Sequence, residues 1–90
     1  MKVRYSARSN AQISAIHEYI REKNETAAAM VIARIRETAR KLTRLPHLGH
    51  PTNEGNVRVI AVPRFPFVIF YKINKNVIVI LNVRHTSQER

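Results

Sequence analysis

Residues 57–83 read VRVIAVPRFPFVIFYKINKNVIVILNV, and this stretch decides the fold. It holds three runs rich in β-branched and aromatic residues, Val57–Val62, Phe67–Ile73 and Val77–Val83. Such runs, when turn residues bound them, are typical of β-strands. The short connection at residues 74–76 reads Asn-Lys-Asn and predicts that the last two runs form a hairpin. We therefore expect the second half of the chain to build an antiparallel sheet.

The segment before these strands has helical periodicity instead. Apolar residues recur there at helical spacing, namely Ile13, Ile16, Tyr19 and Ile20. This stripe predicts an amphipathic helix over residues 10–22. Ser9 and Gln12 have the spacing of a capping box, so we expect Ser9 to cap the helix and Gln12 to reach back to it.

A second, longer helix follows a break at residues 24–26 and stops before Pro46 and Gly49. Its apolar face is formed by Ala28, Val31, Ile32, Ile35, Ala39, Leu42 and Leu45. At the start of the chain, residues 2–5 alternate around Val3 and Tyr5, which predicts a short first strand.

The resulting order, β-α-α-β-β-β, predicts an α+β domain. A helical hairpin, about residues 10–45, should pack on one face of a small, mainly antiparallel four-stranded sheet. The strand hairpins occupy about residues 57–84, and residues 46–56 form a loop. A chain of 90 residues has room for one core, so we expect residues 1–90 to be a single domain.

Both faces of the predicted sheet are apolar. Strict alternation in the last strand places Val77, Val79, Leu81 and Val83 on one side, and Ile78 and Ile80 on the other. A sheet with helices on one face only normally turns polar side chains to the other. Either the sheet curls around its own side chains or a partner covers the second face, and we favour a partner.

The chain is strongly basic, with 16 Lys and Arg against 6 Asp and Glu and a net charge of +10. The excess runs through both halves of the sequence, which favours a polyanionic partner over a merely soluble basic surface. There is no cysteine, which excludes disulfides and thiolate zinc sites. The N-terminus lacks the apolar stretch of a signal peptide, so we expect a cytoplasmic protein with no membrane contact.

No motif for a phosphate loop, a nucleophile elbow or a metal-binding helix occurs in the sequence. His47 and His50 lie in a loop without a third ligand nearby, so we expect no metal and no other cofactor. His17 is expected on the surface of the first helix. Arg84 and His85 close the last strand, where a rigid scaffold often displays functional groups.

The basic residues of the sheet half form a second candidate site. Arg58, Arg64, Lys72 and Arg84 are expected to bind phosphates or carboxylates if they converge on one surface. The alternative is that Arg58 and Lys72 are ordinary charges that protect the edge of a sheet from aggregation.

Several segments, taken in their order along the chain, resemble the ParE branch of the RelE/ParE toxin superfamily. The resemblance runs from about residue 3 to residue 88. The segments are Tyr5-Ser6, Ile16–Ile20, Asn24 with Ala27–Ala29, Leu45–Pro51, Arg64–Tyr71 and Ile80–His85. The family's β-α-α-β-β-β fold agrees with the fold predicted above. One departure is Asn24-Glu25, where the family usually has Asn-Pro before the second helix.

The resemblance implies the toxin of a type II toxin–antitoxin module. ParE-type members inhibit DNA gyrase, and RelE-type members cut messenger RNA in the ribosome with basic strand residues. The positions that match those strand residues here are Val59, Ala61 and Val68, and an apolar side chain cannot stabilise the charge of phosphodiester cleavage. We therefore expect a gyrase inhibitor without catalysis. The alternatives are a ribosome-dependent mRNA endonuclease and a binding module that has lost toxicity.

The target-binding residues expected for this toxin are Arg58, Arg64, Arg84 and His85, and the last three are the catalytic candidates if it is a nuclease. The resemblance also implies a cognate acidic, ParD-like antitoxin. We expect its contacts near Ile20, Val31 and Ile35 on the helical hairpin and near Val59 on the strand Val57–Val62. The polar tail, residues 86–90, is a further candidate for contact with the target.

Overall fold

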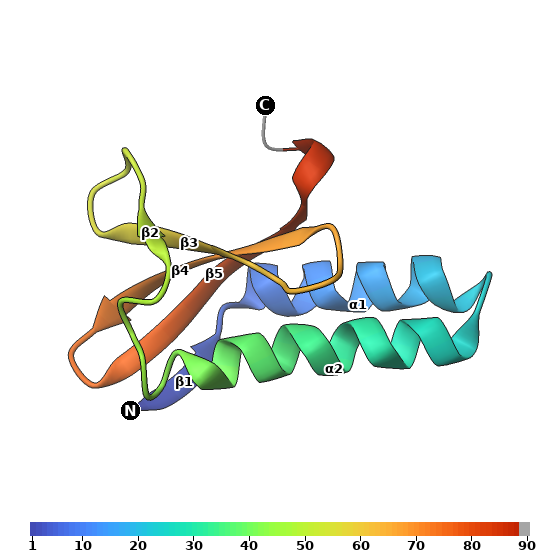
Figure 1. Cartoon of the computed structure of the whole chain (residues 1–90), viewed down its shortest axis with the longest axis horizontal. Helices are drawn as coiled ribbons and strands as arrows, with labels where there is room; N and C mark the ends of the chain where they lie inside the picture. Colours follow the sequence, from blue (N-terminus) through green and yellow to red (C-terminus); the bar gives the residue numbers. More distant parts are fainter. Residues whose placement is uncertain (89–90) are drawn as a thin grey trace.

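Two antiparallel helices cover one face of a five-stranded sheet in the computed structural model, which describes residues 1–88 (Figure 1). In chain order the elements are β1 (Lys2–Tyr5), α1 (Ala7–Arg21), α2 (Glu25–Lys41), β2 (His50–Pro51), β3 (Val57–Ala61), β4 (Phe67–Asn74), β5 (Val77–His85) and the 3-10 helix η1 (Thr86–Gln88). The predicted α+β fold, with a helical hairpin on a mainly antiparallel sheet, is confirmed.

The strand order in the sheet is β1-β5-β4-β3-β2. Only β1 and β5 are parallel, and the other neighbouring strands pair antiparallel. The predicted count of four strands is wrong by one, because His50 and Pro51 leave the expected loop to pair with Val59 and Arg58. This two-residue strand covers part of the edge of β3.

The loop before β2 is held by polar contacts from Tyr71 and Arg58. The Tyr71 hydroxyl donates to the Pro46 carbonyl at 2.8 Å and accepts from the Gly49 N–H at 2.9 Å. The Arg58 guanidinium donates to the Gly49 carbonyl at 2.8 Å and to the His47 carbonyl at 3.2 Å. These contacts satisfy backbone groups of the loop, including the buried Gly49 N–H, so the loop can pack against the sheet and supply a strand.

Helix α1 begins three residues earlier than predicted. The cap is Ser6, whose hydroxyl accepts from the Ser9 N–H at 3.0 Å, and Ser9 is itself buried in the first turn. Gln12 does not reach back to the cap, since its side chain bonds β5 instead. Within the segment 24–26, where a break and a new cap were expected, Asn24 is the cap: its side chain accepts from the Ala27 N–H at 3.0 Å, and α2 begins at Glu25.

The core lies between α2 and the middle of the sheet. Its fully buried large side chains come from α2, from the turn after it and from the two central strands, and are Ile35, Leu42, Ile69, Tyr71, Ile78 and Ile80. Leu45 was expected on the buried face of α2 but is 52% exposed. Leu45 lies in the turn beyond Lys41, the last residue of α2, where its side chain is not packed into the core.

A β-bulge corrects the predicted faces of β5. Tyr71 pairs with Ile80 and Phe70 pairs with Asn82, which leaves Leu81 as an extra residue on β5. A bulge of this kind reverses the alternation of side chains along a strand. Val83 therefore joins Ile78 and Ile80 in the core under the helices, and Val79 lies on the opposite face.

The outer face of the sheet, which the helices do not cover, is partly shielded by the protein itself. Val59, Val68 and Phe70 lie there and are half-buried. The Arg84 guanidinium sits 5.6 Å from the centre of the Phe70 ring, and a shallow hollow of about 270 Å³ separates these two residues from the loop at residues 52–54. This face is therefore a mixed apolar and basic surface.

Candidate partner-binding groove

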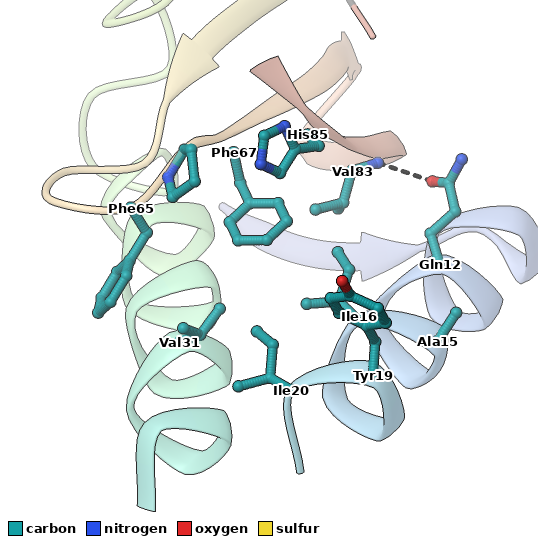
Figure 2. A pocket seen from close by; sticks show the side chains of 11 residues that line it. Gln12, Ala15, Ile16, Tyr19, Ile20, Val31, Phe65, Phe67, Val83 and His85 are labelled. Atoms are coloured by element: carbon teal, nitrogen blue, oxygen red, sulfur yellow. Dashed lines mark hydrogen bonds between the residues drawn. The ribbon is translucent and has the colours of Figure 1, made fainter. Parts of the chain in front are cut away.

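An open groove of about 580 Å³ lies between the two helices and the neighbouring ends of β4 and β5. Figure 2 shows the side chains that converge on it from α1, from α2, from the turn before β4 and from the end of β5. Most of them are apolar: the lining residues are Gln12, Ala15, Ile16, Tyr19, Ile20, Val31, Phe65, Pro66, Phe67, Val83 and His85. This chemistry fits an apolar partner surface.

The groove exists because the helical hairpin is longer than the sheet beneath it. In Figure 1 the end that carries the α1–α2 turn projects beyond the strands. The apolar stripe of α1 continues into this overhang, where Ile16 and Ile20 are only half-buried and Tyr19 is 65% exposed. The protein thus leaves uncovered the apolar side chains that a partner can bury.

The opposite wall is a tight turn between β3 and β4. Pro63–Pro66 form it, and Arg64 adopts a positive φ of 73° within it. The Val62 N–H donates to the Phe67 carbonyl at 2.9 Å and closes the turn. This geometry turns Phe65 and Phe67 toward the helices and leaves Arg64 exposed at the end of the sheet (Figure 2).

Gln12 fastens α1 to the end of β5 at the rim of the groove. Its amide oxygen accepts from the Val83 N–H at 2.7 Å, and its amide nitrogen donates to the Asn82 side chain at 3.2 Å. Strand β1 pairs with β5 only as far as Ile80, so Gln12 bonds the edge of β5 beyond the end of β1. The groove wall is therefore held in place without a neighbouring strand.

His85 lies at the same rim. Its ring meets the Phe67 ring edge-on, with centroids 5.4 Å apart and an interplanar angle of 80°. The Ser87 hydroxyl lies 2.8 Å from His85 Nδ1, and the Ser87 N–H donates to the same nitrogen at 3.1 Å. The Thr86 N–H donates to the Pro66 carbonyl at 2.8 Å, so the start of the tail is anchored beside the groove.

The groove brings together two of the four residues predicted to contact an antitoxin. Ile20 and Val31 line it, whereas Ile35 is fully buried in the core. Val59 lies on the outer face of the sheet, opposite Phe70. The tail was expected to contact the target; residues 86–88 form η1, and residues 89 and 90 lie outside the described part of the chain.

The four predicted target-binding residues do not converge on one surface. Arg58 holds the loop through Gly49, and Arg64 stands at the β3–β4 turn. Arg84 lies on the outer face against Phe70, and His85 points to the groove beside Phe67. Arg84 and His85 are separated because consecutive strand residues face opposite sides of a sheet.

Sequence reasoning missed Tyr19, Phe65 and Gln12 as members of the groove. Tyr19 was assigned to the buried stripe of the first helix, although its position near the helix end was a sign that it would lie past the sheet. Phe65 lies in the segment Arg64–Tyr71, which contributed to the family resemblance, but no role was predicted for Phe65 itself. Nothing local predicted that Gln12 would bond β5, because its partners lie 70 and 71 residues away.

Within residues 1–88, no group of three or more His, Asp or Glu side chains is placed to hold a metal ion. Over the same residues, no helix has both the length and the apolar character needed to cross a bilayer. His17, expected on the surface, is half-buried and lines a small hollow between α1 and α2.

Comparison with known proteins agrees with this architecture. The chain is similar to a Sinorhizobium fredii protein described as "Putative toxin Y4kP", with 31% identity over 88 residues that cover 98% of this chain and 91% of that protein. Its fold is similar to a solved structure described as "Chromosomal ParDE TA system from P. aeruginosa", with a TM-score of 0.84, 20% identity and coverage of 94% and 95% of the two chains. A family model described as the ParE toxin of the type II toxin–antitoxin system parDE matches residues 3–90. Since that match spans nearly the whole chain, the protein belongs to the ParE toxin family of type II toxin–antitoxin systems.

Proposed function

We propose that this toxin inhibits bacterial growth in the cytoplasm by binding DNA gyrase, and that an acidic antitoxin neutralises it by occupying the groove. The observation that carries the gyrase assignment is the scatter of the charged residues. Arg64, Arg84 and His85 were the candidates for cutting RNA, and they stand on a turn, on the outer face and at the groove. Groups that act on one phosphate must lie within hydrogen-bond reach of it together.

The chemistry of the outer face supports the same conclusion. Ala61 pairs with Val68, and Val59, two residues before Ala61, lies on the same side of β3. These three positions match the basic strand residues of RNA-cleaving relatives, and here they form an apolar strip. These three side chains offer no donor for a developing phosphorane charge, and Arg84, which pairs with Val68, supplies one basic group in place of the relatives' set. A toxin of this surface acts by binding.

The groove supports the antitoxin half of the proposal. Its lining is apolar, and its width spans the two helices of the hairpin, which suits the apolar face of an amphipathic helix. The chain's charge of +10 favours an acidic partner. The related structure from P. aeruginosa is described as a ParDE system, which agrees with a ParD-like partner for this toxin.

A supercoiling assay tests the target. Purified toxin added to gyrase and relaxed plasmid should block supercoiling, while message on translating ribosomes stays intact. Arg64→Ala combined with Arg84→Ala should raise the half-inhibitory concentration about tenfold, since charged contacts at an interface are worth that much or more. Message cut on the ribosome, with His85→Ala abolishing the cut, would replace gyrase inhibition with endonuclease activity.

The double variant has a matched control. Arg8→Ala combined with Lys75→Ala removes the same charge from exposed sites, one near the start of α1 and one in the β4–β5 turn. This control should inhibit gyrase at nearly the wild-type concentration. Equal weakening in both double variants would show that overall charge, and not Arg64 and Arg84, accounts for binding.

A further inference from the structure

The charge on the helical hairpin is segregated along its length. From Arg34 to Arg44, in the second half of α2 and the turn after it, five residues are basic and one is acidic. At the other end of the hairpin, Glu18, Glu22 and Glu25 outnumber two cations. Arg21 donates to Glu18 at 2.8 Å and lowers the pKa of that carboxyl, so this end carries paired charge. Positive charge thus concentrates where α2 ends.

Within this basic end, Arg36, Arg40 and Arg44 follow one another at intervals of four residues, and all three are exposed. The Arg44 N–H donates to the Lys41 carbonyl at 3.2 Å, so the turn continues the course of the helix. Side chains spaced in this way on a helix are neighbours, roughly 5–6 Å apart at Cβ. We call these three exposed side chains, two on α2 and one in the turn after it, the arginine row.

Two contacts keep this row positive and ordered. Glu37, the one acidic residue between Arg34 and Arg44, pairs with Arg34 at 3.2 Å, so its negative charge is balanced by a residue outside the row. The Arg36 guanidinium lies 4.9 Å from the centre of the Tyr5 ring, which fixes the first member of the row against β1. The exposed ammonium of Lys41 adds a further positive charge beside the row.

The arginine row differs in chemistry from the groove. Between Ala33 and Arg44 no large apolar side chain is exposed among the described residues, whereas the groove gathers aromatic and aliphatic groups. Protein interfaces are built on apolar and aromatic centres, and nucleic-acid interfaces are more polar and much more positive. The two surfaces therefore suit different classes of partner.

We propose that the arginine row, with Lys41, binds the phosphate backbone of duplex DNA without sequence preference. Guanidinium groups match phosphate geometry, and a line of them can follow one strand. The row contains no exposed amide side chain suited to reading a base edge, so contact stops at the backbone. This binding does not require gyrase. The arginine row is thus a DNA-binding surface separate from the groove.

Fluorescence anisotropy with a labelled duplex and the purified full chain tests the proposal. Wild-type protein should bind two unrelated duplexes equally at about 50 mM salt, with log K falling linearly against log salt. Arg40→Gln, Lys41→Gln and Arg44→Gln together should weaken binding at least about tenfold and flatten the salt slope by roughly 2–3, since each phosphate contact contributes about 0.9. Circular dichroism checks that the variant remains folded.

The matched control is Lys23→Gln, Lys72→Gln and Lys75→Gln, which removes the same charge from sites off the row. It should keep wild-type affinity within about twofold. No binding by the wild-type protein at low salt, or equal weakening in both triple variants, overturns the proposal. The proposal is also overturned if the row variant no longer binds the antitoxin but still binds DNA with wild-type affinity, since the row would then be a protein-binding surface. Gyrase inhibition is measured separately, so a failure of either assignment is distinguishable from a failure of the other.

Discussion

Replacing Tyr19 with aspartate is expected to free the toxin from its antitoxin. Tyr19 lines the groove and is 65% exposed, so the change costs the isolated toxin little. In the complex, a carboxylate would be buried against the apolar side chains of an acidic partner, and the Lys23 ammonium, 4.6 Å from the centre of the Tyr19 ring, offsets only part of this cost. Tyrosine is also among the residues that contribute most to binding at interfaces. We expect affinity for the antitoxin to fall about 100-fold, or about 2.7 kcal/mol.

Met30→Asp is the control for this variant. Met30 is also an exposed apolar helix residue, at 58%, but it lies on α2 outside the groove. Calorimetric titration with the antitoxin should give near wild-type affinity for Met30→Asp, and co-expression of the antitoxin should rescue growth from this variant but not from Tyr19→Asp. Normal neutralisation of the Tyr19 variant would contradict the groove as the antitoxin site.

The largest loss of stability is expected from Gly49→Ala. A Cβ at this position would lie 2.7 Å from the Val59 carbonyl oxygen and 2.8 Å from the Tyr71 hydroxyl. The alanine must therefore push away the backbone of β3 or break the Tyr71 contacts to the loop. Overpacking costs about 1–3 kcal/mol and each buried polar group left unpaired about 1–3 kcal/mol, so we expect a loss of about 3–5 kcal/mol.

Thermal unfolding measures this loss. A decrease of about 4–8 °C in melting temperature accompanies each kcal/mol in a domain of this size, so Gly49→Ala should melt at least about 12 °C lower. Gly55→Ala is the comparison: its φ is +55°, but a Cβ there meets nothing within 4 Å, so only backbone strain of about 1 kcal/mol is expected. Equal melting of the two variants would contradict the packing argument.

Gly49 shows that a residue in a family motif can have a structural role that the motif alone does not reveal. The segment Leu45–Pro51 contributed to the family resemblance, and Gly49 within it was expected only to stop the second helix. In the structure, Gly49 lets Tyr71 and β3 approach the loop closely. The Pro46 carbonyl accepts a hydrogen bond from Tyr71, and the Gly49 carbonyl accepts one from Arg58. Arg58, predicted to bind a target, thus has a structural role that alternation along β3 alone does not reveal.

The sequence by itself determined the kinds of element and most of their order. Runs of β-branched residues predicted β3, β4 and β5, the Asn24 cap predicted the start of α2, and the ordered motifs indicated the family. These features are local, because propensity, capping and turn chemistry act over a few residues. The basic character of residues 34–44 is likewise visible in the sequence alone.

Only the tertiary structure decided which residues meet. Ser6, the cap of α1, also donates to the Leu81 carbonyl at 3.1 Å, and Gln12 bonds partners in β5 that lie 70 and 71 residues away. Strand β2 depends on a contact between Gly49 and Tyr71, 22 residues apart. The bulge at Leu81 reversed the faces of the end of β5, and so decided that Arg84 lies on the outer face and His85 at the groove. The groove follows from the relative lengths of helices and sheet. Each of these outcomes rests on packing between distant segments, and no periodicity within a segment encodes its partner.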